Sequence, residues 1–351
     1  MTRRISWALL AVLVLAQICY PLTTGATRAG LTVATVVLGW LLSVGHALLS
    51  RGPRVAATLV AVATGGGFAI EAIGVATGVP FGSYDYSGEL GPKLAGVPLI
   101  IPLAWTWMAW PAWLAAVRLT GGGTSTTADT ATTADTATTA DTATTADTAA
   151  TADTAATADT AATADTAATA DTAASGDTAA SGDTAASGGT AATGSGGSTV
   201  GRWVGRIALA TVGLAAWDLF LDPQMVAEGY WVWRDATPAL PGLPGIPVSN
   251  YLGWLLFAVL MMSALRPLAG PTAERTDRRD HPMAALYLWT YFSSILAHAV
   301  FLDLPASALW GAAGMSVTAI PLAVTLLRAR RARETPQEDQ QPHRPGVDAT
   351  R

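Results

Sequence analysis

Charged side chains are scarce in this sequence. Lysine, arginine, aspartate and glutamate make up 13% of its 351 residues, about half of the roughly 25% that is usual in a soluble globular domain. The mean hydropathy is +0.37, and apolar residues gather in several runs of about 20, the length that crosses a bilayer as a helix. The scarcity of charge therefore argues against an ordinary soluble domain and predicts an all-α, polytopic integral membrane protein.

Cysteine and histidine are also rare, which limits the chemistry that the chain supports. The single cysteine, Cys19, lies in an apolar run and excludes a disulfide framework and a cysteine metal site. The four histidines, His46, His281, His298 and His343, have neither HxxxH nor HxxEH spacing, the patterns typical of metal sites on helices. We therefore expect no metal, no cofactor and no nucleic-acid partner.

Large apolar residues are missing from one long segment, 126–186. It repeats a unit of six, first TTADTA, then ATADTA and ASGDTA, with ten aspartates from Asp129 to Asp183 and no base. Such a tract cannot bury a core, so we expect a disordered linker over 120–200. A β-solenoid would need an apolar stripe, which the repeat lacks. Without these ten, 15 of the 25 acids remain against 20 bases, all but Lys93 arginine, and this composition is typical of a halophilic or high-GC source.

The apolar runs divide the chain into two halves of four helices each, at 1–119 and 201–330, followed by a disordered tail at 331–351. The pair Arg3-Arg4 before the first run would also suit a signal peptide, but no small-x-small site follows Pro21, so we expect a retained helix. Eight membrane spans are expected, at 5–22, 30–49, 55–77, 97–117, 203–221, 250–268, 283–302 and 305–327.

Basic residues are distributed unequally between the two ends of these spans. If the spans alternate, 17 basic residues lie on the side of the N-terminus, and three, Arg28, Lys93 and Arg234, lie on the other side. An excess of lysine and arginine is typical of cytoplasmic loops. The sequence thus predicts a multi-pass protein of the cell membrane, with both termini and the linker in the cytoplasm and the loops 78–96 and 222–249 outside.

Three acidic side chains lie in or beside the apolar runs toward the outer side. Asp218 and Asp222 are four residues apart and share a helix face, and Pro223 is expected to end that helix. Two carboxyl groups this close divide into an acid and a base. Glu71 is alone in an otherwise apolar helix. Ionisable groups within spans usually mark function, so these three are candidate catalytic residues, although solvated helix ends or a structural hydrogen bond are alternatives.

Aromatic residues accompany the acids. The segment 79–113 is dense in glycine, proline and aromatic residues, which indicates a folded loop that lines a cavity; an interfacial belt is the alternative for its tryptophans. Asn250 begins the sixth span and would suit a helix cap, and a lone buried histidine such as His298 is more often structural. The candidate substrate-binding residues are Phe81, Tyr84, Tyr86, Trp105, Trp217, Tyr230, Trp231, Asn250 and His298.

The amino-acid sequences of both expected outer loops resemble those of one protein family. The runs GVPFGSYDYSGELGPKLAGVPLIIPLAW, AWDLFLDPQMVAEGYWVW and GIPVSNYLGW are similar to those of the membrane hydratases of carotenoid biosynthesis. Haloarchaeal members are bisanhydrobacterioruberin hydratases, and bacterial relatives hydrate γ-carotene or lycopene. The resemblance extends over nearly all apolar segments but not over the aspartate repeat. It implies addition of water to the terminal double bonds of a C50 carotenoid in the bilayer, with other carotenoid-pathway enzymes as candidate partners.

Hydration of such an alkene begins with protonation of its less substituted carbon, after which water captures the tertiary cation. We expect Asp218 to donate the proton and Asp222 or Glu71 to orient and deprotonate the water, while aromatic rings shield the cation. A carotenoid cyclase also protonates a polyene and stays open as an alternative. An elongase that uses a prenyl diphosphate would need more acidic and basic residues, and a carotenoid-binding scaffold or transporter built from a repeat would need more similar halves.

Overall fold

The computed structural model describes residues 2–121 and 191–334. The chain divides into two units, one formed by Met1–Gly121 with Val204–Arg351 and the other by Gly122–Trp203. The first unit contains nearly all of both predicted helical halves. Most of the predicted linker at 120–200, and most of the predicted tail at 331–351, lie outside the described residues.

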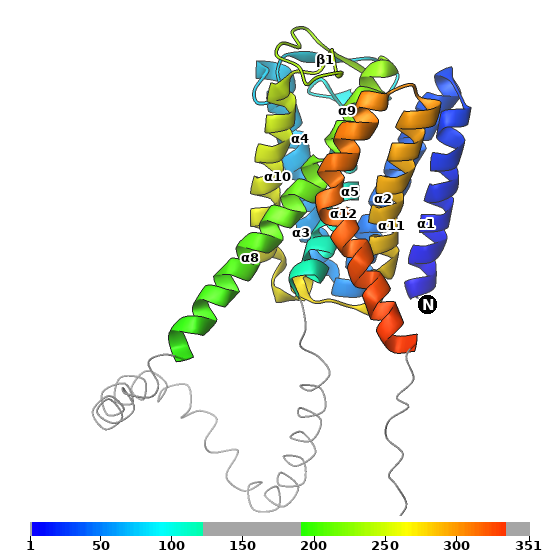
Figure 1. Cartoon of the computed structure of the whole chain (residues 1–351). Coiled ribbons are helices and arrows are strands. Elements are labelled where there is room, and N and C mark those ends of the chain that lie inside the picture. The colour runs from blue at the N-terminus through cyan, green and yellow to red at the C-terminus, as the bar shows by residue number, and fades with distance from the viewer. Residues whose placement is uncertain (1, 122–190, 335–351) are drawn as a thin grey trace, which may run out of the picture. The chain divides into compact units, whose positions relative to one another are not determined.

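Helices make up most of the first unit (Figure 1). In the N-terminal half they are α1 (Thr2–Cys19), η1 (Tyr20–Leu22), α2 (Gly25–Arg51), α3 (Pro53–Leu59), the π-helical η2 (Val60–Gly65), α4 (Gly66–Thr77) and α5 (Ile101–Thr120). In the C-terminal half they are α8 (Ala191–Ala215), α9 (Asp218–Ala227), α10 (Val248–Ala269), η3 (Pro271–Glu274), η4 (Arg278–Asp280), α11 (His281–Leu296), the π-helical η5 (Ala297–Phe301) and α12 (Pro305–Glu334).

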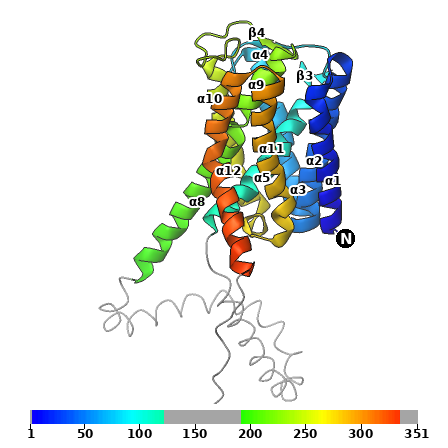
Figure 2. The same cartoon turned by 45° about the vertical axis from the view of Figure 1, so that its right-hand side comes forward.

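Seven helical segments among the described residues are long and apolar enough to cross a membrane. They confirm the predicted class of helical membrane protein and match seven of the eight expected spans. Helix α1 packs on α2 and α11, and α11 packs on α12, so helices from the two halves lie side by side (Figure 2). The seven segments are Arg4–Leu22, Gly25–Arg51, Pro53–Thr77, Val200–Ala227, Val248–Ala269, Arg278–Phe301 and Pro305–Ala332.

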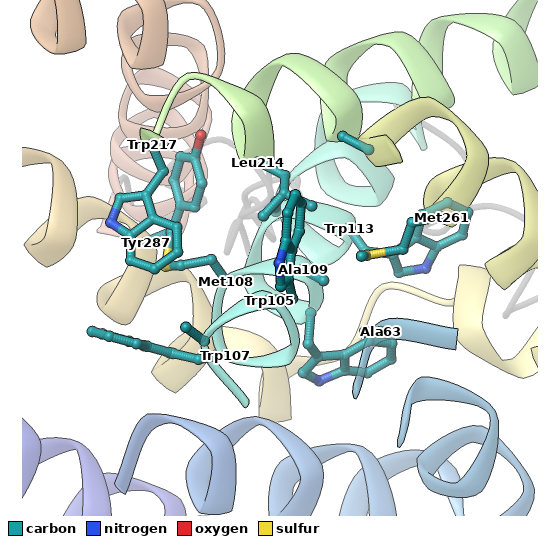
Figure 3. Packing of buried hydrophobic residues seen from close by; sticks show 14 of the residues in the cluster. Ala63, Trp105, Trp107, Met108, Ala109, Trp113, Leu214, Trp217, Met261 and Tyr287 are labelled. Carbon is teal, nitrogen blue, oxygen red and sulfur yellow. The ribbon is translucent and has the colours of Figure 1, made fainter. Parts of the chain in front are cut away.

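The remaining expected span, 97–117, is helix α5, which is not one of these seven because four tryptophans and two prolines lower its hydropathy. Nearly every side chain from Ile101 to Val117 is buried, and α2, α4, α11 and α12 all contact this helix. Trp107 and Trp113 project from different sides of it (Figure 3). A helix surrounded by protein needs no apolar surface toward lipid, so α5 is a central helix of the bundle.

The two expected outer loops pair with each other through a short antiparallel sheet (Figure 1). Strand β1 (Tyr84–Tyr86) lies beside β4 (Trp231–Trp233), with Tyr84 opposite Trp233 and Tyr86 opposite Trp231. Alternate residues of a strand face the same side, so these four aromatic residues face inward, where both tryptophans and Tyr84 are buried. A second sheet joins β2 (Lys93–Leu94) to β3 (Val97–Pro98). The expectation of structured outer loops is thereby confirmed.

Helix α9 corrects one expectation. The break in the fifth span comes before Asp218, and the helix then continues through Pro223 to Ala227. A proline inside a helix leaves the carbonyl four residues earlier without its N–H donor. Here the hydroxyl of Ser307 donates to that carbonyl, of Leu219, over 2.7 Å. Because a side chain from α12 supplies the missing donor, the helix does not end at the proline.

Helix α5 uses the same arrangement. Pro111 lies inside it and leaves the carbonyl of Trp107 without a backbone donor. The hydroxyl of Ser43, from α2, donates to this oxygen over 2.8 Å. Both interior prolines near the site are thus accommodated by a serine from a neighbouring helix.

Candidate functional site

A cavity lies between the two halves of the first unit. About 1200 Å³ of space is free of protein atoms there, with the open mouth included. Side chains from α2, α4, α5, α9, α10 and α11 line it together with the two outer loops. The predicted site residues that line it are Glu71, Phe81, Tyr84, Tyr86, Trp105, Trp217, Asp222, Trp231 and Asn250.

Three predicted site residues are buried but do not line this cavity. Asp218 lies behind Asp222 and is fully buried, and Tyr230 and His298 are 1% exposed. Tyr230 bonds through its backbone, since its N–H donates to Met225 and its carbonyl accepts from Ser87. The structure therefore places Asp222 rather than Asp218 at the cavity surface.

Glu71 is held by three donors from two different parts of the chain. Its Oε2 accepts hydrogen bonds from the hydroxyls of Tyr84, at 2.6 Å, and Tyr86, at 2.8 Å, and its Oε1 accepts from the indole N–H of Trp105 at 3.1 Å. Burial first, and then the negative charge of Glu71, raises the pKa of both tyrosines, so they stay protonated donors. Three donors to one carboxyl group favour its ionised form, whereas its burial favours the neutral form.

Asp218 and Asp222 share one partner. The amide nitrogen of Asn250 donates to Oδ2 of Asp218 over 2.9 Å and also to Oδ2 of Asp222. The shared face that their spacing predicts is thereby present. The expectation that Asn250 caps its helix is wrong, because α10 begins at Val248 and is preceded by Pro247. Asn250 lies in the first turn, from which its side chain reaches across to α9.

Aromatic rings surround these carboxyl groups. The indole of Trp105 stacks on that of Trp254 with centroids 3.6 Å apart, and Trp217 packs edge-on against Trp107 at 5.4 Å and against Trp254 at 6.2 Å. At the outer end, Tyr86 packs edge-on against Trp231 at 5.5 Å. The buried acids thus lie in a cavity whose lining is rich in aromatic rings.

The cavity is lined by acidic groups and by no basic ones among the described residues. Its lining includes the carboxyl groups of Glu71 and Asp222, but no lysine, arginine or histidine from the described residues. Of the three basic residues expected on the outer side, Arg28 pairs with Glu228 and Arg234 pairs with Asp85, while Lys93 donates to the carbonyl of Tyr86. The hydrogen bonds from Arg234 hold the pKa of the Asp85 carboxyl below its usual value. The site therefore suits a ligand, or a reaction intermediate, that is neutral or positive.

The part of the chain that the structure describes contains no group of three His, Cys, Asp or Glu that would hold a metal ion. The two acids of the cavity are instead engaged by amide, phenol and indole donors. These donors fix the position of each carboxyl group, an arrangement that can support proton transfer.

Several lining residues were missed from the sequence. Trp254 and Gln224 lie in the very motifs that carry Asn250 and Asp222, four and two residues further along. Helical spacing predicts that Trp254 shares a face with Asn250, so this residue was accessible to sequence reasoning. Trp107 is one of the tryptophans for which a cavity and an interfacial belt were the alternatives, and it lines the cavity; its contact with Trp217 depends on tertiary packing.

Comparison with known proteins identifies the family. A sequence model described as "Carotenoid biosynthesis protein" matches residues 31–158 and 185–320. This chain belongs to the carotenoid biosynthesis protein family. The matched segments include Glu71, Asp222 and Asn250, so the cavity belongs to the part that the family shares. The first segment also runs into the aspartate repeat as far as residue 158. No curated protein and no solved structure matches the chain.

Proposed function

We propose that this family member is a carotenoid hydratase that adds water to the terminal double bonds of a C50 carotenoid, converting bisanhydrobacterioruberin to bacterioruberin. The observation that carries the proposal is the pairing of two kinds of carboxyl group in one aromatic cavity. Asp222 shares Asn250 with a second buried aspartate, whereas Glu71 is held by three donors. One arrangement suits a proton donor and the other suits a stable negative charge.

Asp222 is the proton donor in this proposal. Two buried carboxyl groups that share one amide, with no cation beside them, hold a proton between them because two adjacent charges would repel each other. Oδ1 of Asp218 has no hydrogen-bond partner among the described residues, which would be unfavourable for a carboxylate. Since only Asp222 of the pair lines the cavity, it transfers the proton and Asp218 positions it. This reverses the order expected from depth in the helix.

The reaction is balanced with these groups. The O–H of Asp222 protonates the less substituted carbon of the alkene. The π electrons of the alkene form the new C–H bond, and the electron pair of the O–H bond stays on the Asp222 carboxylate. The tertiary cation that forms is stabilised by the ionised Glu71 and by the rings of Trp105, Trp217 and Trp231, for which cation–π contacts contribute about 2 kcal/mol when desolvated. Water adds its oxygen to the cation and releases one proton to the Asp222 carboxylate, which restores the acid. The net change is addition of one water.

The location of the reaction follows from the same proposal. The substrate enters from the bilayer, both termini and the linker are cytoplasmic, and the acids lie toward the outer leaflet, as the distribution of arginine predicts. Each end of a symmetric carotenoid then reaches the site in turn. A singly hydrated intermediate is expected to accumulate when enzyme is scarce, and other enzymes of the pathway are candidate neighbours in the membrane.

The test compares Asp222→Asn with Asp218→Asn in membranes supplied with the anhydro-carotenoid in D₂O. The asparagine at 222 is expected to lower hydration by about 10²–10⁴-fold, the usual contribution of a positioned acid. The asparagine at 218 is expected to have a smaller effect, because it still fills the space behind Asp222. Full hydration by Asp222→Asn at normal protein levels would overturn the assignment, and a cyclised product without added water would favour a cyclase. An elongase that binds a diphosphate is disfavoured by the absence of basic residues from the described cavity lining.

A further inference from the structure

Gln224 lines the cavity and is connected to a buried histidine that the proposed reaction does not use. Its side-chain amide lies 3.2 Å from Nε2 of His298. The other ring nitrogen, Nδ1, lies 2.8 Å from the hydroxyl of Ser307, and this hydroxyl donates to the carbonyl of Leu219. Three elements, α9, η5 and α12, thus meet in one chain of hydrogen bonds that ends at the cavity wall.

The donor and the acceptor of each hydrogen bond in this series follow from its last bond, between Ser307 and Leu219. The only hydrogen of the Ser307 hydroxyl is given to Leu219, so its oxygen accepts from the Nδ1–H of His298. The imidazole is buried with no carboxylate among its hydrogen-bond partners, which favours the neutral ring. Its Nε2 then has no hydrogen and must accept. Since a half-turn exchanges the oxygen and nitrogen of an amide, the NH₂ of Gln224 faces the ring and its oxygen faces away.

The exposed side of Gln224 meets a polar part of the cavity. The hydroxyl of Tyr20, also a lining residue, lies near the Gln224 side chain but has no hydrogen-bond partner of standard geometry among the described residues. The lining residues Thr35 and Thr290 are 8% and 2% exposed, and their hydroxyls have no hydrogen-bond partner among the described residues. Buried hydroxyls without partners are rare in native proteins and point to a bound water or ligand group.

We propose that Gln224, together with the hydroxyls of Tyr20, Thr35 and Thr290, forms a subsite for an O–H group, and that the carbonyl oxygen of Gln224 accepts its hydrogen. The O–H group belongs either to water or to an alcohol on the ligand. His298 and Ser307 are positioning residues that act through Gln224 by keeping its oxygen toward the cavity. The subsite deepens the proposed function, since it provides for the water or alcohol of a hydration, but its binding test does not require turnover.

The experiment measures binding to the purified full-length protein by quenching of tryptophan fluorescence. The probes are a C20 polyene hydrocarbon and the same polyene with a terminal tertiary alcohol. If the subsite takes a ligand alcohol, the wild type binds the alcohol more tightly, and Gln224→Leu weakens it about fivefold, as expected for one hydrogen bond, while the hydrocarbon changes less than twofold. Gln224→Glu retains an acceptor and is expected to keep the preference.

Ser307→Ala tests whether His298 and Ser307 set the orientation of the Gln224 side chain. This variant removes the acceptor for Nδ1–H, so the ring proton is free to move to Nε2. The Gln224 oxygen then turns toward the ring and away from the cavity. It is expected to reproduce the loss in Gln224→Leu, although Ser307 does not line the cavity. Unchanged alcohol binding in Ser307→Ala, with a normal melting temperature, would refute the positioning role of His298.

Water as the occupant gives a different result. Both probes then bind alike in the wild type, and Gln224→Leu raises the ratio of deuterium exchange into the alkene over hydration in D₂O, because the cation loses a proton before water adds. If Gln224→Leu changes neither the preference for the alcohol nor this ratio, the subsite is refuted. A wild type that shows neither hydration nor exchange refutes the hydratase instead, while the alcohol preference still decides the subsite.

Discussion

At the scale of single residues, Glu71 illustrates how the cavity holds a buried carboxyl group in one position. Its two oxygens accept from Tyr84, Tyr86 and Trp105, which come from the outer loop and from α5. These donors are in place before any ligand binds. A carboxylate that is already oriented stabilises a developing positive charge without further reorganisation.

Glu71→Gln removes this charge with little change of shape and is expected to lower the rate of hydration about a hundredfold, within the range seen for preorganised electrostatic groups. The amide oxygen can still accept from both tyrosine hydroxyls, but the amide NH₂ then faces the indole N–H of Trp105, which loses its acceptor. Tyr86→Phe, which removes one donor of the three, is expected to have a smaller effect. Rates are measured from the hydrated product in membranes that contain equal amounts of protein. Equal rates in Glu71→Gln and the wild type would contradict the electrostatic role.

The kinds of residue that line the cavity could be predicted from the sequence, but which of Asp218 and Asp222 faces it could not. Acids in an apolar run and aromatic residues in a glycine-rich loop pointed to Glu71, Asp222 and Tyr84, and the structure brings these three to one cavity, while their roles stay predictions. Sequence position also favoured Asp218 as the proton donor, because it lies deeper in the span. In the structure this depth places Asp218 behind Asp222. Which face of α9 meets the cavity depends on how α9, α10 and α12 pack, and a single sequence does not contain that information.

At the scale of elements, helix α5 shows why hydropathy alone is an incomplete guide. Its tryptophans and prolines reduce its apolar character, yet it packs against α2, α4, α11 and α12. Close contact with α2 depends on Gly39, where an added Cβ would lie 2.5 Å from the Trp107 ring. Small residues allow helices in membranes to approach closely, and Trp107 uses the space that Gly39 leaves.

Gly39→Ala is therefore expected to lower the free energy of unfolding by about 1–3 kcal/mol, since the indole must shift in a packed environment. Gly45→Ala is the matched control in the same helix, because nothing lies within 4 Å of its added Cβ. Thermal unfolding of the purified variants measures the difference. Equal stability of the two variants would contradict the proposed packing of Trp107.

The pairing of Ser43 with the carbonyl freed by Pro111 predicts a coupling between two helices. Ser43→Ala is expected to reduce the free energy of unfolding by about 0.6–1.7 kcal/mol, the range for side-chain hydrogen bonds within membranes. In a Pro111→Ala background the backbone N–H at 111 can bond to Trp107, so the same substitution should have less effect. A double-mutant cycle measures this difference. Additive effects would show that the serine stabilises the protein in another way.

At the scale of the whole molecule, the number and order of helices followed from the apolar runs, and the family followed from the loops. The pairing of the two loops did not. Strands β1 and β4 are about 150 residues apart in the sequence, as the bond from Arg234 to Asp85, 149 residues away, illustrates. Each strand is only three residues long, too short for a periodic signal. The pairing of β1 with β4 places Tyr86 opposite Trp231 in the cavity lining. The cavity is therefore completed by a long-range contact that no local sequence pattern predicts.

The proposed orientation of the chain makes the last prediction. With 17 of 20 basic residues on one side of the spans, the loop that carries Glu89 is expected outside and the turn that carries Thr276 inside. Both side chains are exposed. In a Cys19→Ser background, Glu89→Cys should react with a membrane-impermeant maleimide in intact cells, whereas Thr276→Cys should react only after the membrane is opened. Each variant is its own control, because opening the membrane makes both cysteines reactive. The reverse pattern would place the acids of the cavity toward the cytoplasm. The second end of the singly hydrated intermediate would then have to reach the site from the cytoplasmic leaflet.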